Sequence, residues 1–233
     1  MRLFYSPNIE TEFELPSDEA AHCHRVLRLH SKDQIVLTDG QGSLFKAEIL
    51  EIDNKHCRVR VLSQLTQEKL WKGHIHVAVS PAKLMDRNEW FVEKAVEIGV
   101  DEISFIHTRY SERDVIKMER IERVVISAMK QSNKARKPII NQIIPFSQFL
   151  SKEYGGDRFI AHCYESGKVS LIDSVVGGRD SLVMIGPEGD FSKEEVSMSF
   201  ERGYIPVSLG LSRLRTETAA IVAVHIMNLI NRI

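Results

Sequence analysis

Several features that identify common protein classes are missing from this chain of 233 residues. Its three cysteines form no CxxC pair and are odd in number, which excludes a disulfide framework and predicts reduced thiols in a cytoplasmic protein. The formal net charge is −1, so the overall charge indicates neither a nucleic-acid nor a membrane partner. The N-terminus MRLFYSPNIE has no apolar run, so we expect no signal peptide.

Long apolar runs are also missing. The longest, Ala219–Ile230, is interrupted by His225 and Asn228 and falls short of the ~20 residues that span a bilayer. It predicts a buried helix and no membrane partner. Two His-x-His pairs, starting at His22 and His74, lack the further ligands of a metal site, so we expect no metal.

The N-terminal part of the chain is β-rich. Segments rich in β-branched residues are separated by turn-forming Asp, Asn and Gly, which predicts a small barrel. The predicted strands are Gln34–Thr38, Leu44–Ile52 and Cys57–Leu62. Ser17 followed by acidic residues predicts the N-cap of a short helix. The polar segment Thr66–Gly73 is the candidate linker, so we expect domains at 1–70 and 71–233.

The rest of the chain alternates between strand and helix patterns, which is typical of a mostly parallel α/β sheet covered on both sides. The predicted strands are Ile75–Ser80, Ile103–His107, Phe159–Cys163, Leu182–Gly186 and Pro206–Gly210. Apolar residues at helical spacing from Met118 to Ala128 predict one buried helix face. Ser192 and Glu195 have the spacing of a capping box at a helix start.

Three loops leave carboxyl ends of predicted strands, where open α/β sheets bind ligands. They are Ala161–Ser166, Gly186–Asp190 and Leu209–Thr218. The second follows an apolar strand as IGPEGDF, and its glycines indicate either a tight strand-to-helix turn or close approach of a ligand. The chain has no GxxxxGK[ST] phosphate loop and no GxGxxG fingerprint.

Two of these loops carry a specific signature. Ile185-GPEG-Gly189 and Leu209-GLSRLRTETA-Ala219 together resemble the ribosomal RNA small subunit methyltransferase E family, within the SPOUT class of RNA methyltransferases. The resemblance covers nearly the whole chain. It extends to His24-RVLRL-Leu29 and Asp39-Gly40, and further matches are Lys83, Arg87, Lys94, Glu97, Gly99, Val100, Gln131, Ser132 and Pro138.

The resemblance implies a fold, a cofactor and a substrate. It implies an N-terminal PUA-like barrel that helps to hold RNA, followed by an α/β SPOUT domain whose C-terminal end forms a deep trefoil knot. It also implies a homodimer that binds S-adenosylmethionine (SAM) in the knot loops. The implied reaction methylates N3 of one uridine in the decoding region of 16S ribosomal RNA, on the assembled small subunit.

The resemblance also implies which residues bind the cofactor. Gly186 and Gly189 would let the backbone approach the adenosine and the methionine tail, and Leu209, Gly210 and Leu214 would close the other side. The remaining cofactor candidates are His162, Ile185 and Glu188.

The chemistry of the transfer indicates catalytic candidates. SAM is already activated, but uridine N3 is a poor nucleophile until it loses its proton. Arg215 is the candidate cation for the anion that develops on O2 and O4, and Glu188 and Glu217 are candidate bases. The alternatives are a phosphate contact or a salt bridge to Glu217 for Arg215, and a helix-start role for Glu217.

Basic residues concentrate between Arg109 and Lys137, where nine Lys/Arg stand against four Asp/Glu. Such a stripe suits RNA phosphates, and its alternative is a solvated helix face with i,i+4 ion pairs. The RNA-binding candidates are Arg25, Arg28, Gln131, Lys134 and Arg136.

The chain departs from the family pattern at a few positions. Asp190 stands where the family repeats glycine, Lys134 stands where arginine is common, and Ser212-Arg213 replaces an arginine-aliphatic pair, so Arg213 is a candidate substitute. Three other functions stay open: a SPOUT methyltransferase acting on tRNA, a non-catalytic RNA-binding protein that retains SAM, and a nucleotide-dependent hydrolase. The missing phosphate-loop lysine argues against the hydrolase.

Overall fold

The computed structural model describes residues 3–165 and 167–232, and its contacts divide the chain into two compact units. The first unit runs up to Lys69 and also includes Ile126–Lys137. The second consists of Leu70–Val125 and the chain from Pro138 onward. The two units are described separately below.

The first unit is built on a five-stranded sheet with strand order β1-β3-β4-β5-β2. The strands are β1 (Leu3–Tyr5), β2 (Glu12–Glu14), β3 (Gln34–Thr38), β4 (Ser43–Ile52) and β5 (Cys57–Thr66). Only the β1–β3 pairing is parallel among these described strands. One face buries an apolar cluster that includes Leu37, Ile49 and Val59. This burial is what stabilises the small sheet.

Two details of the first unit differ from the sequence predictions. β1 and β2 have three residues each, too few to give a strand pattern in the sequence. The short helix α1 (Ser17–Ala21) has Pro16, not Ser17, at its N-cap, and no side chain caps it. The predicted short helix is present and starts at Ser17, but the N-cap role of Ser17 was wrong, because Pro16 supplies the extended backbone (φ −49°, ψ 142°) that precedes the first turn. A π-helix, η1 (His22–Val26), continues from α1.

The second unit is a seven-stranded parallel sheet with strand order β10-β12-β9-β11-β6-β7-β8. Its strands are β6 (Ile75–Val79), β7 (Glu102–His107), β8 (Ile139–Pro145), β9 (Asp157–Ala161), β10 (Val169–Ser170), β11 (Ser181–Ile185) and β12 (Ile205–Ser208). The central strands β6 and β11 are buried at every position, which explains why their sequences are mostly apolar. The five predicted strands are present, whereas the edge strands β8 and β10 were missed. The predicted α/β fold class is confirmed.

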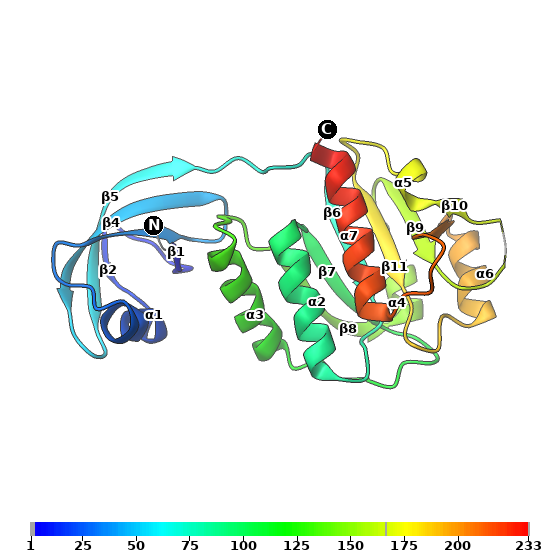
Figure 1. The fold of residues 1–233 in the computed structure, drawn as a ribbon, viewed down its shortest axis with the longest axis horizontal. Helices are drawn as coiled ribbons and strands as arrows, with labels where there is room; N and C mark the ends of the chain where they lie inside the picture. Colours follow the sequence, from blue (N-terminus) through cyan, green and yellow to red (C-terminus); the bar gives the residue numbers. More distant parts are fainter. Residues whose placement is uncertain (1–2, 166, 233) are drawn as a thin grey trace. The chain divides into compact units, whose positions relative to one another are not determined.

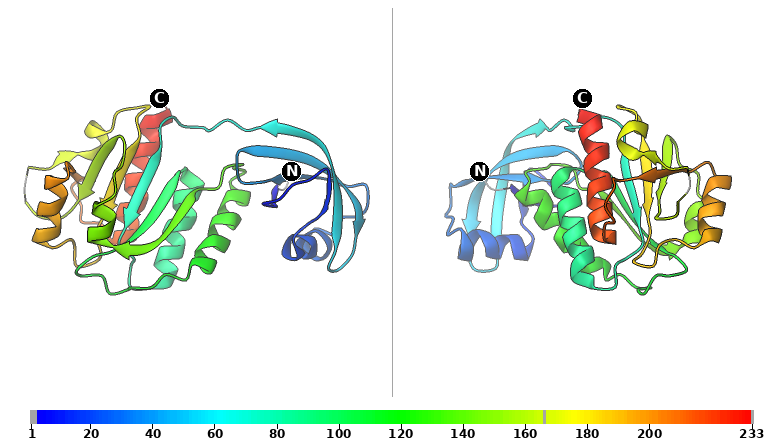
Figure 2. Two further views of the ribbon diagram at one scale, coloured as in Figure 1. Left: turned by 180° about the vertical axis from the view of Figure 1, so that it is seen from behind. Right: turned by 45° about the vertical axis from the view of Figure 1, so that its right-hand side comes forward.

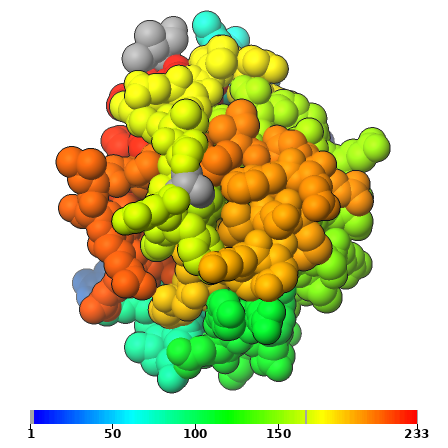
Figure 3. All heavy atoms as spheres, turned by 90° about the vertical axis from the view of Figure 1, so that its right-hand side faces the viewer, coloured from blue at the N-terminus to red at the C-terminus, as the bar shows by residue number. Residues whose placement is uncertain are grey.

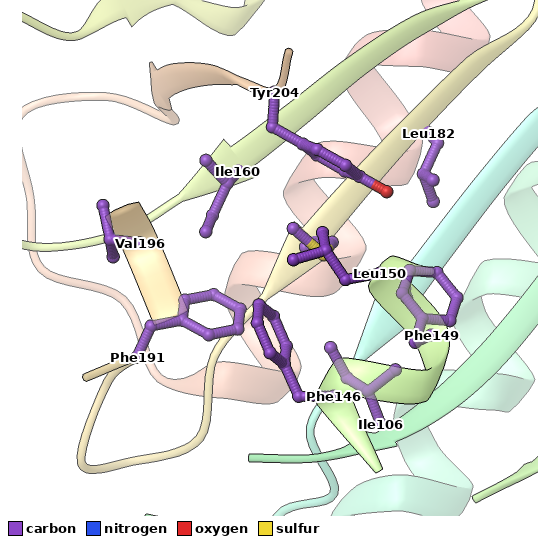
Figure 4. Packing of buried hydrophobic residues seen from close by; sticks show 11 residues of the cluster. Ile106, Phe146, Phe149, Leu150, Ile160, Leu182, Phe191, Val196 and Tyr204 are labelled. Carbon is purple, nitrogen blue, oxygen red and sulfur yellow. The ribbon is translucent and has the colours of Figure 1, made fainter. Parts of the chain in front are cut away.

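Helices cover both faces of this sheet (Figures 1 and 2). The helices of this unit are α2 (Met85–Ile98), α4 (Phe146–Leu150), α5 (Leu171–Ser174), α6 (Lys193–Glu201) and α7 (Thr216–Arg232), together with the N-terminal part of α3 (Met118–Gln131), which from Ile126 onward belongs to the first unit. α2 and α7 lie side by side, and α7 packs on β6 and β11. On the opposite face, Figure 4 shows Phe146, Phe149 and Leu150 of α4 packed with Phe191 and Tyr204. Each such side chain contributes about 2 kcal/mol through burial.

Helix α7 accounts for the long apolar run of the sequence. Its two buried asparagines bind backbone groups: Asn228 Nδ2 donates to Gly99 O at 3.0 Å, and Asn231 Oδ1 accepts from Gly178 N at 2.8 Å. These bonds fix how the helix is rotated on the sheet. Gly99 has φ 123°, and a Cβ there would lie 2.5 Å from the Trp71 ring, so glycine is required. No helix within residues 3–165 and 167–232 is long and apolar enough to cross a membrane.

Candidate functional site

A cavity of about 610 Å³ lies in the second unit, a volume suited to a small-molecule cofactor. The loops after β9, β11 and β12 and the first turn of α7 line it. In Figure 3 the yellow-green segment after β9 runs between the darker orange loop after β12 and the lighter orange α6. The cavity therefore lies at the carboxyl ends of parallel strands, where the sequence predicted a ligand site.

Most of the predicted cofactor residues meet in this cavity. Of the candidates, the following line it: His162, Ile185, Gly186, Glu188, Leu209, Gly210, Leu214 and Arg215. Gly189 and Glu217 are not among the described residues that form the lining. Arg213, the candidate substitute for the family's arginine, also lines it, and the lining residues that were not singled out are Ala161, Cys163, Lys168, Pro187, Asp190, Val207, Ser208, Leu211, Ser212, Thr216 and Ala219. Most of these adjoin a predicted residue in the same loop.

The glycines of the loop after β11 accommodate neighbouring protein atoms. A Cβ on Gly186 would lie 3.1 Å from the backbone nitrogen of Phe191, and one on Gly189 would lie 2.9 Å from Tyr110 Cβ. The left-handed residue of this loop is Asp190, with φ 67°. Aspartate tolerates that conformation better than most residues, so the turn survives without the family's glycine.

The Asp190 carboxylate joins two of the loops that line the cavity. Its Oδ2 accepts from the backbone N–H of Cys163 at 2.8 Å, and its Oδ1 accepts from that of Phe191 at 2.8 Å. Cys163 follows β9, whereas Asp190 follows β11. Burial and the nearby Asp190 charge raise the pKa of the Cys163 thiol, which keeps it protonated near neutral pH. Asp190 therefore acts as a latch between the two loops.

The start of α7 is tied to the same loop. The buried Thr216 hydroxyl donates to Gly186 O at 3.1 Å, which joins LRTET to GPEG. Glu217 is also buried, and its carboxylate pairs with Arg87 of α2 at 3.5 Å. The expected alternative of an Arg215–Glu217 salt bridge is not found among the described residues. Arg215 is exposed and lines the cavity, as does the neighbouring Arg213.

Glu188 lies at the rim of the cavity with its carboxylate partly engaged. Its Oε1 accepts from the backbone N–H of Lys83 at 3.1 Å. The Lys83 ammonium in turn pairs with Glu112 at 2.7 Å, and the hydrogen bond to Glu112 raises the pKa of Lys83. Glu188 is exposed, so the carboxylate is accessible to a substrate at the rim.

His162 is buried without polar partners for its ring. It is 6% exposed, and neither ring nitrogen has a hydrogen-bond partner among the described residues. The rings of Tyr164 and Phe200 lie 5.7 and 6.2 Å from it, centroid to centroid. Burial lowers the pKa of His162, so the imidazole is neutral at physiological pH.

The RNA-binding candidates all belong to the first unit. Arg25 is exposed in η1, and Arg28 is exposed with φ 53°. Gln131 is the last residue of α3, and the half-buried Lys134 follows it. Arg136 is exposed, and its guanidinium packs against Gly42, so closely that a Cβ at that glycine would lie 2.7 Å from it.

The basic stripe forms its ion pairs mainly with other elements. Arg109 pairs with Glu194 at 3.3 Å, and Arg120 pairs with Glu89 of α2 at 2.6 Å. Lys130 pairs with the buried Glu19 within the first unit. The partners in these three pairs are far apart in sequence, so they are not the i,i+4 ion pairs that a solvated helix face would form. The Arg109–Glu194 pair is exposed and costs little to break, so the Arg109 cation remains available to phosphates, whereas Lys130 neutralises a buried carboxylate.

The second His-x-His pair belongs to a polar network in which His76 is buried and His74 is partly exposed. His76 Nε2 lies 2.9 Å from Ser104 Oγ, and His74 Nε2 lies 3.0 Å from Glu102. Burial lowers the pKa of His76 to about 4, and the bond from His74 lowers that of Glu102 to about 2. Within the described part of the chain, no group of three His, Cys, Asp or Glu could hold a metal ion.

Comparison with known proteins identifies the family. Residues 69–228 match the family model of an RNA methyltransferase domain, and residues 15–62 match that of an RNA methyltransferase PUA domain. A ribosomal RNA small subunit methyltransferase E from Rickettsia conorii is 30% identical over 92% of this chain and 88% of its own length.

Solved structures agree with this assignment. A probable rRNA methyltransferase from Porphyromonas gingivalis has a TM-score of 0.94 at 46% identity, over 99% of this chain and 98% of that one. A ribosomal RNA small subunit methyltransferase E from Neisseria gonorrhoeae, bound to SAM, has a TM-score of 0.85 at 27% identity, over 96% and 95% of the chains. The chain belongs to the ribosomal RNA small subunit methyltransferase E family.

Proposed function

We propose that this protein transfers a methyl group from SAM to N3 of a uridine in the decoding region of 16S ribosomal RNA. The observation that carries the proposal is the cavity built from the GPEG and LRTET loops, in a chain whose Neisseria relative is bound to SAM. The substrate is the assembled small subunit, and the active form is a homodimer whose C-terminal end forms a deep trefoil knot.

The residues of the cavity fit SAM as a ligand. Ile185, Leu209 and Leu214 offer apolar surface to the adenine, and the backbone groups of Gly186 and Gly210 offer hydrogen bonds. SAM carries a sulfonium cation, so the neutral state of the nearby His162 ring avoids repulsion between like charges.

The chain must control charge on the uridine, because SAM supplies an already activated methyl group. The N3–H bond must break before the new N–C bond is complete, so negative charge develops on N3, O2 and O4 as the proton leaves and disappears when the methyl group is transferred. Arg215, which is exposed and lines the cavity, is the candidate cation for that charge, and Glu188 at the rim is the candidate that accepts the proton. Glu217 has the structural role, because it is buried and paired with Arg87.

RNA is held by the first unit as well as by the cofactor domain. The first unit contains the region that matches the PUA domain of RNA methyltransferases. We assign phosphate and RNA contacts to the following residues: Arg25, Arg28, Gln131, Lys134 and Arg136. Contacts of this kind position the substrate and leave the choice of base to the cofactor site.

The proposal is tested by methyl transfer from isotope-labelled SAM to small subunits that lack the modification. After digestion of the RNA, mass spectrometry identifies the labelled nucleoside. Label in 3-methyluridine supports the proposal. The same assay is run with tRNA. Label found in tRNA and not in 16S RNA would show that tRNA is the substrate, and SAM binding without transfer to either RNA would favour a non-catalytic RNA-binding protein.

A further inference from the structure

An exposed aromatic side chain borders the cofactor site. Tyr110 lies in the loop after β7 and is 46% exposed. Its Cβ lies against Gly189, because a Cβ added to that glycine would be only 2.9 Å from Tyr110 Cβ. The residues on either side of Gly189, Glu188 and Asp190, both line the cavity. The Tyr110 ring is therefore displayed beside the loop that binds the cofactor.

The loop that carries Tyr110 is held firmly by polar contacts. The backbone N–H of Arg109 donates to Glu195 of α6 at 2.9 Å, and Ser111 Oγ lies 2.7 Å from the buried Ser80 hydroxyl. The N–H of Thr108 donates to Ser111 Oγ at 2.8 Å. Because these bonds join the loop to α6 and to Ser80, the residue that follows β6, the ring is presented by a rigid support, as a binding surface requires.

The surroundings of the ring suit a nucleic acid. The Arg109 guanidinium lies 5.8 Å from the ring centroid, and the Arg113 guanidinium is held by two bonds to Lys83 O at 2.6 and 3.0 Å. Both cations are exposed or half-exposed and can meet phosphates next to a stacked base. In Figure 3 the green surface that includes this loop borders the gold and orange residues that follow β11.

We propose that Tyr110 is the stacking platform for the target uridine, with Arg109 and Arg113 as the flanking phosphate contacts. The inference rests on the proposed methyl transfer to RNA. A base in structured RNA must leave its stack to reach the methyl group, and an aromatic face replaces the stacking that it loses. Tyr110 acts by stacking, so its ring is required and its hydroxyl is not.

The test compares Tyr110→Ala, Tyr110→Phe and the control Trp90→Ala. Trp90 is exposed to a similar extent, 43%, but is carried by helix α2. Three quantities are measured: SAM affinity by calorimetry, methyl transfer to small subunits, and affinity for a uridine-containing single strand in the presence of S-adenosylhomocysteine. Y110A is expected to lose roughly tenfold or more in RNA affinity and in kcat/KM for RNA, the scale of one base-aromatic stack. The SAM affinity of Y110A stays within about twofold of the wild type, because the ring stacks on RNA and not on the cofactor. Y110F and W90A keep a stacking ring at position 110, so all three of their quantities also stay within about twofold.

A direct contact readout separates stacking from a structural role. RNA with 4-thiouridine at the methylated position should cross-link to the peptide that contains Tyr110. If the wild type methylates RNA and Y110A matches it, the platform is wrong while the proposed function stands. If the wild type methylates no RNA, the proposed function fails. In that case the single-strand affinities decide on the platform, which fails too if Y110A binds as tightly as the wild type.

Discussion

Removing the Asp190 carboxylate should weaken SAM binding, because that carboxylate joins the loops after β9 and β11. Both bonds, to the backbone N–H groups of Cys163 and Phe191, are 2.8 Å long, and bonds of this charge-assisted kind contribute about 1.5 kcal/mol each. Glycine at φ 67° recovers about 1 kcal/mol of backbone strain. Asp190→Gly should therefore cost about 2 kcal/mol of loop ordering, or roughly 30-fold in SAM affinity.

The substitutions at this position should form an ordered series. Asp190→Asn keeps one acceptor oxygen and should lose less affinity than Asp190→Gly, whereas Asp190→Ala keeps the strain and should lose about 100-fold. Calorimetry with SAM measures the affinities, and hydrogen exchange at the Cys163 amide measures release of the loop. Lys32→Gly, at φ 75° in the first unit, controls for relief of strain alone. Wild-type SAM affinity in Asp190→Gly, with an unchanged Cys163 amide, would refute the latch.

Three further predictions concern the site and the core. Arg215→Ala should lower kcat about 100-fold with SAM affinity kept, since the cation acts on the transition state, and an unchanged kcat in single-turnover assays would remove Arg215 from the mechanism. Thr216→Val leaves the buried carbonyl of Gly186 without its donor, so it should lower the free energy of thermal unfolding by roughly 1–2 kcal/mol and weaken SAM binding. Unchanged stability and SAM affinity would contradict the proposed role of this hydrogen bond. The pKa of His76 is about 4 in the folded chain against an ordinary 6.5, so the unfolded chain binds more protons between these values. Stability should therefore fall by on the order of 3 kcal/mol as pH drops from 6.5 to 4. His76→Asn should flatten this dependence of stability on pH between 6.5 and 4. The loss of stability below pH 4.5 that comes from Glu102, whose pKa is about 2, should remain. Urea titrations of the variant that show an unchanged pH dependence would assign it to another group.

The position of the cofactor cavity follows from local sequence signals. Mostly apolar strands mark the centre of a parallel sheet, and a glycine-containing loop directly after such a strand, as after β11, marks its carboxyl edge. The Ser192–Glu195 capping box is present in full, because both partners lie within one helical turn. The strands missed by sequence analysis are either short, as the three-residue β1 is, or lie at the sheet edge, as β8 does, where half-burial leaves no clear pattern.

Side-chain pairing in the site depends on distant parts of the chain. Glu217 pairs with Arg87, far from it in sequence, while Arg215, two residues before Glu217, lines the cavity. The reason for Gly189 lies in Tyr110 of another loop, which no local pattern contains. Spacing within a motif predicts which loop binds a ligand, whereas the partner of each side chain is decided when the strands assemble.

The central claim is methylation of one uridine at N3, and mapping the modified nucleotide in small-subunit RNA tests it most directly. A methyl group at N3 blocks base pairing, so reverse transcription stops at that nucleotide. Small subunits lacking the modification should gain one stop, in the decoding region, after incubation with the protein and SAM, and Arg215→Ala should not produce it at equal times. No new stop with the wild-type protein, or stops spread over many positions, would contradict the account.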